Sequence, residues 1–368
     1  MGTMNNAMRA IRPMIILMLL LSCITASAVG PVLNTMVPRG GTRGTDVEVV
    51  FRGKNLQDAA ALLFHADGIT LKEIIKAEAG SMVCILTIAP DCALGPQPIR
   101  VRTATGLSNI RLFSVGNLKE VDEAEPNSLM SQAKAIEIDT TVNGVVNNED
   151  VDYFTVTLAE GERVAVEIEA LRLGHMLFDV KARFYDPQGR EVIAEDDTAL
   201  MKQDAAFIYT AQEAGAHTIA VSEASYGGSG NYNYRLHVGH FPRPLAVTPM
   251  GGMPGATVLV NWLGDTGIQT QEVILPTEPA GLSPIMAETD KGVSPTAVPF
   301  RLLEFPGVLE VEPNNAREQA TAGQSPGAST VSLARKVTWI GFPSTRRKAR
   351  NTTCAFGHAP WDRRWTAS

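Results

Sequence analysis

Cysteine, aromatic residues and helical periodicity are all scarce in this sequence, and each shortage excludes a class of protein. Only 4 of the 368 residues are Cys, and 6% are aromatic. So few cysteines cannot build the disulfide framework of a small secreted scaffold. Apolar residues seldom recur at the 3.6-residue spacing of an amphipathic helix, and a short turn at 128–135 is the best helical candidate. The sequence therefore predicts neither a helical nor a disulfide-stapled protein.

Catalytic motifs are missing as well. The chain contains no G-x-S-x-G nucleophile elbow and no H-E-x-x-H zinc motif. Its six histidines show no metal-ligand spacing with cysteine. His237 and His240 are three residues apart, but the first falls on a predicted strand and the second beyond it. We therefore predict no catalytic residues and interpret the protein as non-enzymatic.

Basic residues are few in the main part of the chain. Residues 29–334 hold 22 Lys and Arg against 38 Asp and Glu, a net charge of −16. Binding to a phosphate backbone needs clustered Lys and Arg, so this acidity argues against nucleic acid as a partner. It is compatible with divalent cations, which prefer oxygen ligands.

No apolar run reaches the roughly 20 residues that a membrane-spanning helix needs. The run "MIILMLLL", residues 14–21, follows two arginines and precedes the small residues "ASA", residues 26–28. This order is typical of a secretory signal peptide cut after Ala28. A membrane anchor and a lipoprotein cleavage box at "LLSC", residues 20–23, are the alternatives. The mature protein is predicted to be secreted, periplasmic or on the cell surface, without a stable membrane span.

Alternation with a period of two residues is abundant. In "DYFTVTL", Phe154, Val156 and Leu158 share one face. The strings "RVAVEIEA" and "YNYRLHV" alternate in the same way, and "YDPQGR" has the Pro and Gly of a hairpin turn. Such segments are half-buried strands with one wet face, and close turn signals between them indicate β-sandwiches. An all-β fold is therefore predicted.

Two strings occur twice in the chain. "EAEPNSLMSQA", residues 123–133, returns as "EVEPNNAREQA", residues 310–320, with six of eleven positions identical. "PRGGTRGTDVEV", residues 38–49, returns as "PMGGMPGATVLV", residues 249–260. The second string reads as a Gly-rich turn that leads into a strand. Their alternation along the chain indicates a tandem duplication of a two-domain unit.

The two repeats resemble two known families. "PVLNTMVPRGGTRGTDVEVVFRGKNL" resembles the opening of IPT/TIG-type immunoglobulin-like domains. "EAEPNSLMSQA", "NGVVNNEDVDYFTVTLAEGERVAVEIEA" and the closing "YNYRLHV" resemble the bacterial pre-peptidase C-terminal (PPC) domain. The resemblance implies an extracellular, multidomain surface or secreted protein. The alternation of these domains is similar to that in large secreted proteins of planctomycete-type bacteria.

We therefore predict tandem β-sandwich domains, Ig-like and then PPC jelly-roll-like, followed by a second Ig-like domain and an incomplete PPC domain. The predicted ranges are 1–28 for the signal peptide, 30–116 and 242–305 for the Ig-like domains, 117–241 for the PPC-like domain, 309–335 for its truncated second copy and 336–368 for an aberrant basic tail. In that tail "KVTWIGF" stands where the second copy should have its "DVDYF". A change of reading frame near Arg335 is our hypothesis, and a genuine basic tail is the alternative. Residues 309–368 are expected to be poorly ordered.

Acidic and amide side chains at alternate positions are the best candidates for a metal site. Calcium takes six to eight oxygen ligands. The related collagen-binding domains of bacterial collagenases hold calcium through an acidic segment of this kind, so the resemblance implies a calcium site here. The candidate ligands are Glu125, Asn127, Asp150 and Asp152. Turn capping and protection of exposed strand edges are the structural alternative for these residues.

Two further questions stay open at this level. Cys84 and Cys92 could pair locally or remain two buried thiols. Tyr226, in "SYGGSGNYNY", is the most plausible exposed ring for a carbohydrate or collagen-like ligand, whereas an ordinary core position is the alternative.

The function predicted from the sequence is a secreted, non-catalytic protein in adhesion, surface structure or ligand binding. Its ligand would be an extracellular protein, peptide or polysaccharide. The alternative function is an accessory or truncated part of an extracellular peptidase that lacks its catalytic domain.

Overall fold

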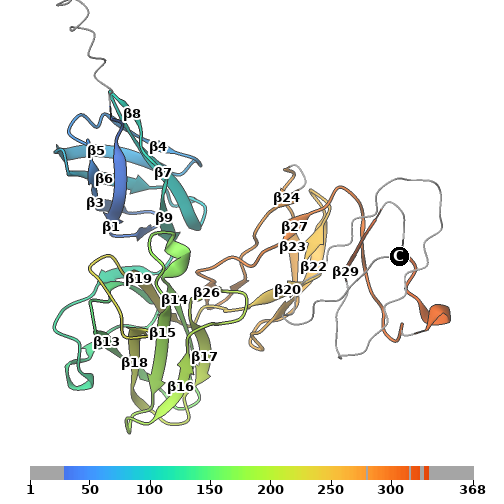
Figure 1. Ribbon diagram of the computed structural model, residues 1–368. Helices are drawn as coiled ribbons and strands as arrows, with labels where there is room; N and C mark the ends of the chain where they lie inside the picture. The colour runs from blue at the N-terminus through green and yellow to red at the C-terminus, as the bar shows by residue number, and fades with distance from the viewer. Residues whose placement is uncertain (1–28, 279–280, 315, 324–326, 331–368) are drawn as a thin grey trace, which may run out of the picture.

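The computed structural model describes residues 29–278, 281–314, 316–323 and 327–330. The predicted signal peptide, residues 1–28, and the predicted basic tail, residues 336–368, lie outside the described residues. The described chain is an all-β protein of successive β-sandwich units, as the sequence predicts (Figure 1). In the part that the structure describes, no helix has the length and apolar character to cross a membrane.

The N-terminal sandwich packs two sheets around one apolar core. Their orders are β1-β3-β6-β5 and β2-β9-β7-β4, with β8 paired to β7. The strands are β1 Val32–Val37, β2 Gly40–Thr42, β3 Asp46–Lys54, β4 Ala61–Phe64, β5 Ile69–Ala77, β6 Ser81–Ile88, β7 Gly95–Thr103, β8 Gly106–Leu107 and β9 Arg111–Gly116. The alternate residues Val49 and Phe51 of β3 are fully buried between the sheets, which is the expected result of their period-two spacing.

The central sandwich is the largest unit and has two five-stranded sheets. Their orders are β10-β12-β19-β14-β17 and β11-β13-β18-β15-β16. The elements are β10 Lys119–Asp122, η1 Met130–Gln132, β11 Lys134–Ala135, β12 Thr140–Val145, β13 Val151–Leu158, β14 Arg163–Glu169, η2 Leu171–Leu173, β15 Val180–Tyr185, β16 Glu191–Glu195, β17 Ala206–Thr210, β18 Gly215–Glu223 and β19 Asn233–Gly239. Phe154, Val156 and Leu158 are buried in its core, as predicted from their alternation.

The third unit begins like the N-terminal sandwich but is smaller. Its strands are β20 Ala246–Thr248, β21 Gly251–Gly252, β22 Thr257–Leu263, β23 Gln271–Ile274, β24 Gly281–Leu282, β25 Glu288–Thr289, β26 Gly292–Val293 and β27 Arg301–Leu302. The first strand of each unit pairs antiparallel with the third, and the short Gly-containing second strand pairs parallel with a late one. The repeated Gly-turn string therefore forms the same local structure twice.

The second copy of the Glu-Pro-Asn string also repeats its local structure. β28 Gly307–Leu309 and β29 Ala328–Thr330 pair in parallel, as β10 and β12 do in the central sandwich. The short helix η3, Arg317–Gln319, follows the second string as η1 follows the first. Both Glu-Pro bonds of the repeat are cis. The described residues between 307 and 330 thus repeat the local structure at the start of the central sandwich.

One expectation about wet strand faces is wrong. The alternation in β14 and β19 predicted that one face of each strand would contact water. Instead Glu167 and Arg235 are 0% and 1% exposed, and His237 is 2% exposed. Their face lies against the neighbouring units, where ion pairs compensate the buried charges. Period-two alternation identified the strands but could not show that another unit covers their polar side.

The two cysteines of the N-terminal sandwich are buried free thiols. Cys84 lies on β6 and Cys92 in the following turn, and no disulfide joins them. Burial raises the pKa of Cys84 to about 12, so its thiol stays protonated at neutral pH. Of the two possibilities left open by the sequence, the structure has two core thiols.

Candidate metal centre and ligand-binding face

Acidic side chains converge where the repeated string enters the central sandwich. Ligand oxygens of Glu125, Asp150 and Asp152 all lie within 4.8 Å of one another. Glu123 joins them through the hydroxyl of Tyr234, which contacts Glu123 Oε2 at 3.1 Å and Asp152 Oδ2 at 2.9 Å. A single hydroxyl proton can serve only one of these two oxygens at a time. The cluster therefore has more negative charge than its hydrogen bonds can satisfy.

The pKa values of this cluster reflect the lack of a basic partner among the described residues. Burial raises the pKa of Asp152 to about 8, and the negative charge of Glu123 adds to the rise. Burial also raises the pKa of Glu123 to about 7, although the amide of Val145 donates to its carboxylate. Burial and mutual repulsion raise the pKa of these carboxyl groups. Adding a cation or a proton therefore stabilises them.

The fourth candidate ligand from the sequence, Asn127, is linked to Glu125 through its backbone. It is 0% exposed, and both polar atoms of its side-chain amide lack a hydrogen-bond partner among the described residues. Its backbone is fixed on both sides: its N–H donates to Glu125 Oε2 at 2.9 Å, and its carbonyl accepts from the N–H of Tyr153 at 3.0 Å. Asp152 Oδ1 is also shielded and unpartnered. Unused buried oxygens beside carboxylates fit the donor set of calcium.

The structural alternative also has support at one residue. Asp150 Oδ1 accepts a hydrogen bond from the N–H of Val151 at 2.9 Å, as expected for a turn-capping Asp. This contact uses one oxygen of Asp150. The other predicted ligands keep free oxygen atoms, so capping does not account for the whole cluster.

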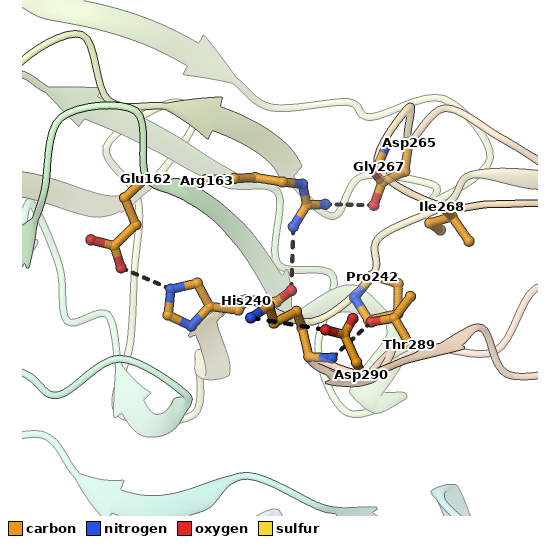
Figure 2. A pocket seen from close by; sticks show the side chains of 10 residues that line it. Glu162, Arg163, His240, Pro242, Asp265, Gly267, Ile268, Thr289 and Asp290 are labelled. Atoms are coloured by element: carbon orange, nitrogen blue, oxygen red, sulfur yellow. Dashed lines mark hydrogen bonds and ion pairs between the residues drawn. The ribbon is translucent and has the colours of Figure 1, made fainter.

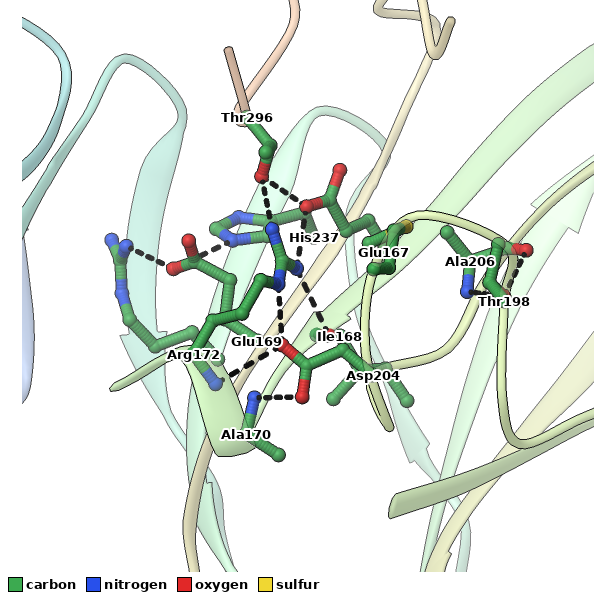
Figure 3. A network of polar contacts seen from close by, with 12 residues as sticks. Glu167, Ile168, Glu169, Ala170, Arg172, Thr198, Asp204, Ala206, His237 and Thr296 are labelled. Carbon is green, nitrogen blue, oxygen red and sulfur yellow. Dashed lines mark hydrogen bonds and ion pairs between the residues drawn. The ribbon is translucent and has the colours of Figure 1, made fainter. Parts of the chain in front are cut away.

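A second charged network, drawn in Figure 3, lies on the outer side of the other sheet and is neutralised by arginine. Arg172 contacts Glu167 Oε1 at 2.8 Å and Asp204 Oδ2 at 2.5 Å. Arg243 contacts the other oxygen of Glu167 at 2.6 Å. The network reaches the third unit through Thr296, whose hydroxyl bonds both Glu167 and Arg172. These contacts join the central and third units. Both acids, Glu167 and Asp204, have an arginine partner.

The acids of this network titrate according to their partners. Burial alone would raise the pKa of Glu167, but the charges of Arg243 and Arg172 outweigh it and lower the pKa. Asp204 is the exception, because burial raises its pKa even beside Arg172. Asp204 also accepts from the N–H groups of residues 170 and 171, so its oxygens are fully used.

A cavity of about 330 Å³ lies at the same joint, beside the turn between β13 and β14 (Figure 2). His240 is held there by Glu162 Oε1 at 2.8 Å and by Asp139 Oδ2 at 3.2 Å. Arg163 contacts Asp265 Oδ2 of the third unit at 2.5 Å. The main charged groups that line the cavity are therefore already engaged with one another.

The two histidines that are three apart in the sequence do not share a site. His237 Nδ1 lies 2.8 Å from the hydroxyl of Thr141, whereas His240 lies between Asp139 and Glu162. Among the described residues, the only group of three potential metal ligands is the Glu125, Asp150 and Asp152 cluster. The structure brings together Glu125, Asp150 and Asp152, three of the four candidate ligands from the sequence. Glu123 belongs to the same acidic string but was not among the four candidates, and Tyr234 gave no signal because its strand lies more than 80 residues from the acids at 150–152.

The outer face of the sheet β11-β13-β18-β15-β16 has a different character. Small residues of the middle strand, including Thr218 and Ala220, are paired on either side with larger ones. Tyr153 and Arg183 flank Ala220, and Tyr185 lies beside Thr218. Tyr226, from the loop after β18, is 51% exposed, as the sequence suggested. Its hydroxyl accepts from Arg183 at 3.2 Å, and the guanidinium lies 5.9 Å from the centre of its ring.

Comparisons with known proteins give no family for this chain. No protein-family model and no curated protein matches it. Among solved structures it is similar to SGBP-B of the mixed-linkage glucan utilization locus of Bacteroides ovatus, in complex with a mixed-linkage heptasaccharide, with 11% identity over 57% of this chain and a TM-score of 0.22. The match spans 52% of that protein, about half its length.

Two other solved structures are similar at the same low level. SGBP-B of a complex xyloglucan utilization locus in Bacteroides uniformis has 12% identity over 57% of this chain and 72% of its own, with a TM-score of 0.20. The adhesin InvE of Yersinia pseudotuberculosis has 12% identity over 60% of this chain and 65% of its own, with a TM-score of 0.19.

Proposed function

We propose that this protein is a secreted, non-catalytic ligand-binding protein that binds a polysaccharide on the outer face of its central sandwich. The observation that carries the proposal is the set of rings and polar groups around β18. Tyr153, Tyr185 and Tyr226 offer amphipathic rings, and Arg183 offers a charged donor among them. Tyrosine and arginine provide large contact areas with a polar end, which suits a ligand whose surface is both apolar and hydroxylated.

The backbone at Tyr226 adds weight to this proposal. Its φ is +59°, in the left-handed region that non-glycine residues seldom adopt. Such conformations cost about 1–3 kcal/mol and cluster at binding and active sites. An exposed aromatic residue in this conformation has no role in the core that would explain it.

The metal centre and the ligand-binding face are connected through one pair of loops. We propose that calcium bound by the acidic cluster fixes the loop 146–150. That loop contacts the Tyr226 loop, since the N–H of Ser229 donates to the carbonyl of Val146 at 3.1 Å. Gly228 approaches so closely that an added Cβ would lie 1.9 Å from the carbonyl oxygen of Asn147. Binding of the polysaccharide is therefore expected to depend on calcium.

A binding experiment on the full chain tests the proposal. The protein is applied to a glycan array and its affinity for a retained polysaccharide is measured by calorimetry, with calcium and with EDTA. Tyr226→Ala should weaken binding by about tenfold or more, since buried aromatic anchors dominate such contacts. Leu282→Ala, at an 81% exposed position of the third unit, is the matched control and should bind normally. Binding to protein or peptide ligands alone, or equal affinity of both variants, would contradict the proposal.

The family assignment of the central sandwich is also part of the proposal. We infer that it is a PPC-type domain preceded by an IPT/TIG-like domain. The repeated parallel pairing of β10 with β12 and of β28 with β29 supports a duplicated unit of one kind.

A further inference from the structure

A buried arginine at the joint between the N-terminal and central sandwiches has a charge without a counterpart. Arg39 lies between β1 and β2 and is 2% exposed. Its Nη2 donates across the joint to the carbonyl of Leu173 at 2.8 Å. Its Nε and Nη1 are shielded and have no acceptor among the described residues. Each unpaired buried donor costs about 1–3 kcal/mol, so two on one guanidinium point to a missing partner.

A second arginine and a histidine lie near Arg39. Arg111 begins β9 and His175 follows η2, and both are partly exposed. Arg111 Nε donates to the carbonyl of Asn34 at 2.8 Å and its Nη1 to that of Ile110 at 3.4 Å, so Nη2 is the group it can offer to a ligand.

Both ring nitrogens of His175 are shielded, and the side chain of Asn231 is their hydrogen-bonding neighbour. Burial lowers the pKa of His175 to about 4, and the charges of Arg39 and Arg111 add to the decrease. Burial and Arg111 lower the pKa of Arg39 to about 10.

The carboxylates at this joint are already paired with another arginine, Arg235. Arg235 lies against the backbone of Gly40, where an added Cβ would lie 2.6 Å from its guanidinium carbon. Its own charge is paired with Glu120 at 2.5 Å and with Glu169 at 3.1 Å. The carboxylates at this joint are thus engaged with Arg235, and none forms an ion pair with Arg39 or Arg111 among the described residues.

We propose that Arg39, Arg111 and His175 form a binding site for an oxyanion, namely a sulfate, phosphate or carboxylate group. A guanidinium presents its N–H groups in a planar fork that matches such oxygens, and charge-assisted hydrogen bonds are the strongest that a protein makes. The ligand enters on the partly exposed side between Arg111 and His175. Because Arg39 and Arg111 belong to one sandwich and His175 to the next, the bound anion ties the two units together. This inference does not rest on the proposed polysaccharide site.

The second copy of the Gly-turn string provides an internal comparison. Met250 stands at the position that Arg39 occupies in the first copy and is 44% exposed. The turn therefore forms with a methionine there, so Arg39 is not required by the local fold. Arg39→Met is consequently a matched replacement that removes the charge and keeps an unbranched side chain.

Titration of the full chain with sodium sulfate tests the site. Calorimetry and thermal unfolding are measured at constant ionic strength, with sodium chloride as the reference salt. The natural protein should bind sulfate saturably in calorimetry. Its Tm should rise over the same range of sulfate concentration. Arg39→Met should lose the saturable component and keep only the gradual stabilisation that sulfate gives most proteins. Sodium phosphate and sodium acetate in parallel titrations distinguish a tetrahedral from a planar oxyanion.

Two further variants protect the test against a folding defect. Arg111→Gln and His175→Gln are partly exposed, so they should fold even if Arg39→Met does not. Each is expected to weaken anion binding by about tenfold, because each removes one charged or hydrogen-bonding partner. No saturable binding of any of the three anions, or the same affinity in all variants, would overturn the proposal.

Discussion

The central sandwich contains two buried clusters of acidic side chains, and the pKa values of Glu123 and Asp152 in one shift in the opposite direction to those of Glu167 and Glu169 in the other. In one cluster burial raises the pKa of Glu123 to about 7 and that of Asp152 to about 8. In the other, burial also opposes ionisation, yet the charges of Arg243 and Arg172 lower the pKa of Glu167. The hydrogen bond with His237 and the charge of Arg235 lower the pKa of Glu169. The chemical groups are the same, so the difference comes from their partners. A buried carboxylate cluster that lacks arginine is stabilised by an added proton or cation, which is why we propose calcium there.

The joint at Arg39 extends this comparison to the opposite sign. There the buried groups are cationic and no acid pairs with them among the described residues. The molecule thus holds a paired cluster, an acidic cluster and a basic cluster within one unit and its joints. Each of the three is tested by one prediction below, and a fourth prediction concerns the candidate ligand-binding face.

The largest effect is expected when the paired cluster loses an arginine. Arg172→Met leaves Glu167 and Asp204 buried without their shared partner. Breaking a buried pair in this way costs about 3–5 kcal/mol in the free energy of unfolding. Urea unfolding measures it, with Arg183→Met as the control because its nearest acid, Glu191, is 3.7 Å away and half exposed. Equal losses in the two variants would remove the distinction between paired and unpaired networks.

Calcium should produce the next largest effect, and only through the acidic cluster. A ligand at about 100 times its Kd stabilises the native state by about 2.7 kcal/mol. We expect a rise in Tm with millimolar calcium that Asp152→Asn abolishes. In EDTA the same variant should be at least as stable as the natural protein, since it replaces a buried carboxyl group whose ionisation is unfavourable by a neutral amide.

Glu169→Gln is the matched control for the calcium experiment. It removes an acid from the paired cluster, where Arg235 and His237 neighbour it. Its loss of stability should be the same with and without calcium. An unchanged Tm of the natural protein in calcium would retire the metal centre and leave turn capping as the role of Asp150.

A smaller effect is expected from acid at the basic joint. His175 takes up its proton near pH 4 in the folded chain and near 6.5 in the unfolded chain. Between these values the unfolded chain binds more protons, so the free energy of unfolding falls as the pH decreases from 6.5 to 4. After allowance for its partial exposure, the contribution is about 1–2 kcal/mol.

The pH dependence is measured by urea unfolding at several pH values, with His175→Gln as the comparison. The variant should lose less stability across this interval than the natural protein. Sulfate should reduce the difference between them, because an anion stabilises the protonated ring. The same slope in both proteins would show that His175 does not titrate differently on folding.

The smallest change in stability is expected at the ligand-binding face. Tyr226 is half exposed and has a positive φ, so Tyr226→Gly should leave the free energy of unfolding within about 1 kcal/mol or raise it. Polysaccharide binding should nevertheless be lost. A variant that unfolds readily would assign Tyr226 to the structure instead of to the ligand.

The sequence predicted the fold class well because burial imposes a simple period on each strand. Phe154 and Val156 alternate with polar residues and lie in the core as expected. The candidate metal ligands could also be proposed from the sequence. Glu125 and Asn127 belong to a repeated string, and Asp150 and Asp152 lie at the start of a strand. Patterns of this kind lie within short segments, so they can be predicted without knowing which distant segments pack together.

Contacts between distant segments could not be predicted in this way. Tyr234 joins the acidic cluster from the last strand of the sandwich, and its hydroxyl gives no signal in the sequence. Arg39 looked like an ordinary turn residue, because its burial depends on a carbonyl 134 residues away. The alternation of β19 suggested a wet face for His237 that the neighbouring units cover. Packing between units, and not the order within a strand, decides these positions.

The connections between the units determine how such a chain behaves as a whole. Only residues 117 and 118 separate β9 from β10, and the segment 241–244 that leads to β20 is buried. Neither connection has the length or exposure of a flexible linker. Each additional repeat would therefore extend the protein by a fixed step along a stiff support. A binding face on such a support is presented at a set distance from its point of attachment, and the number of repeats determines that distance.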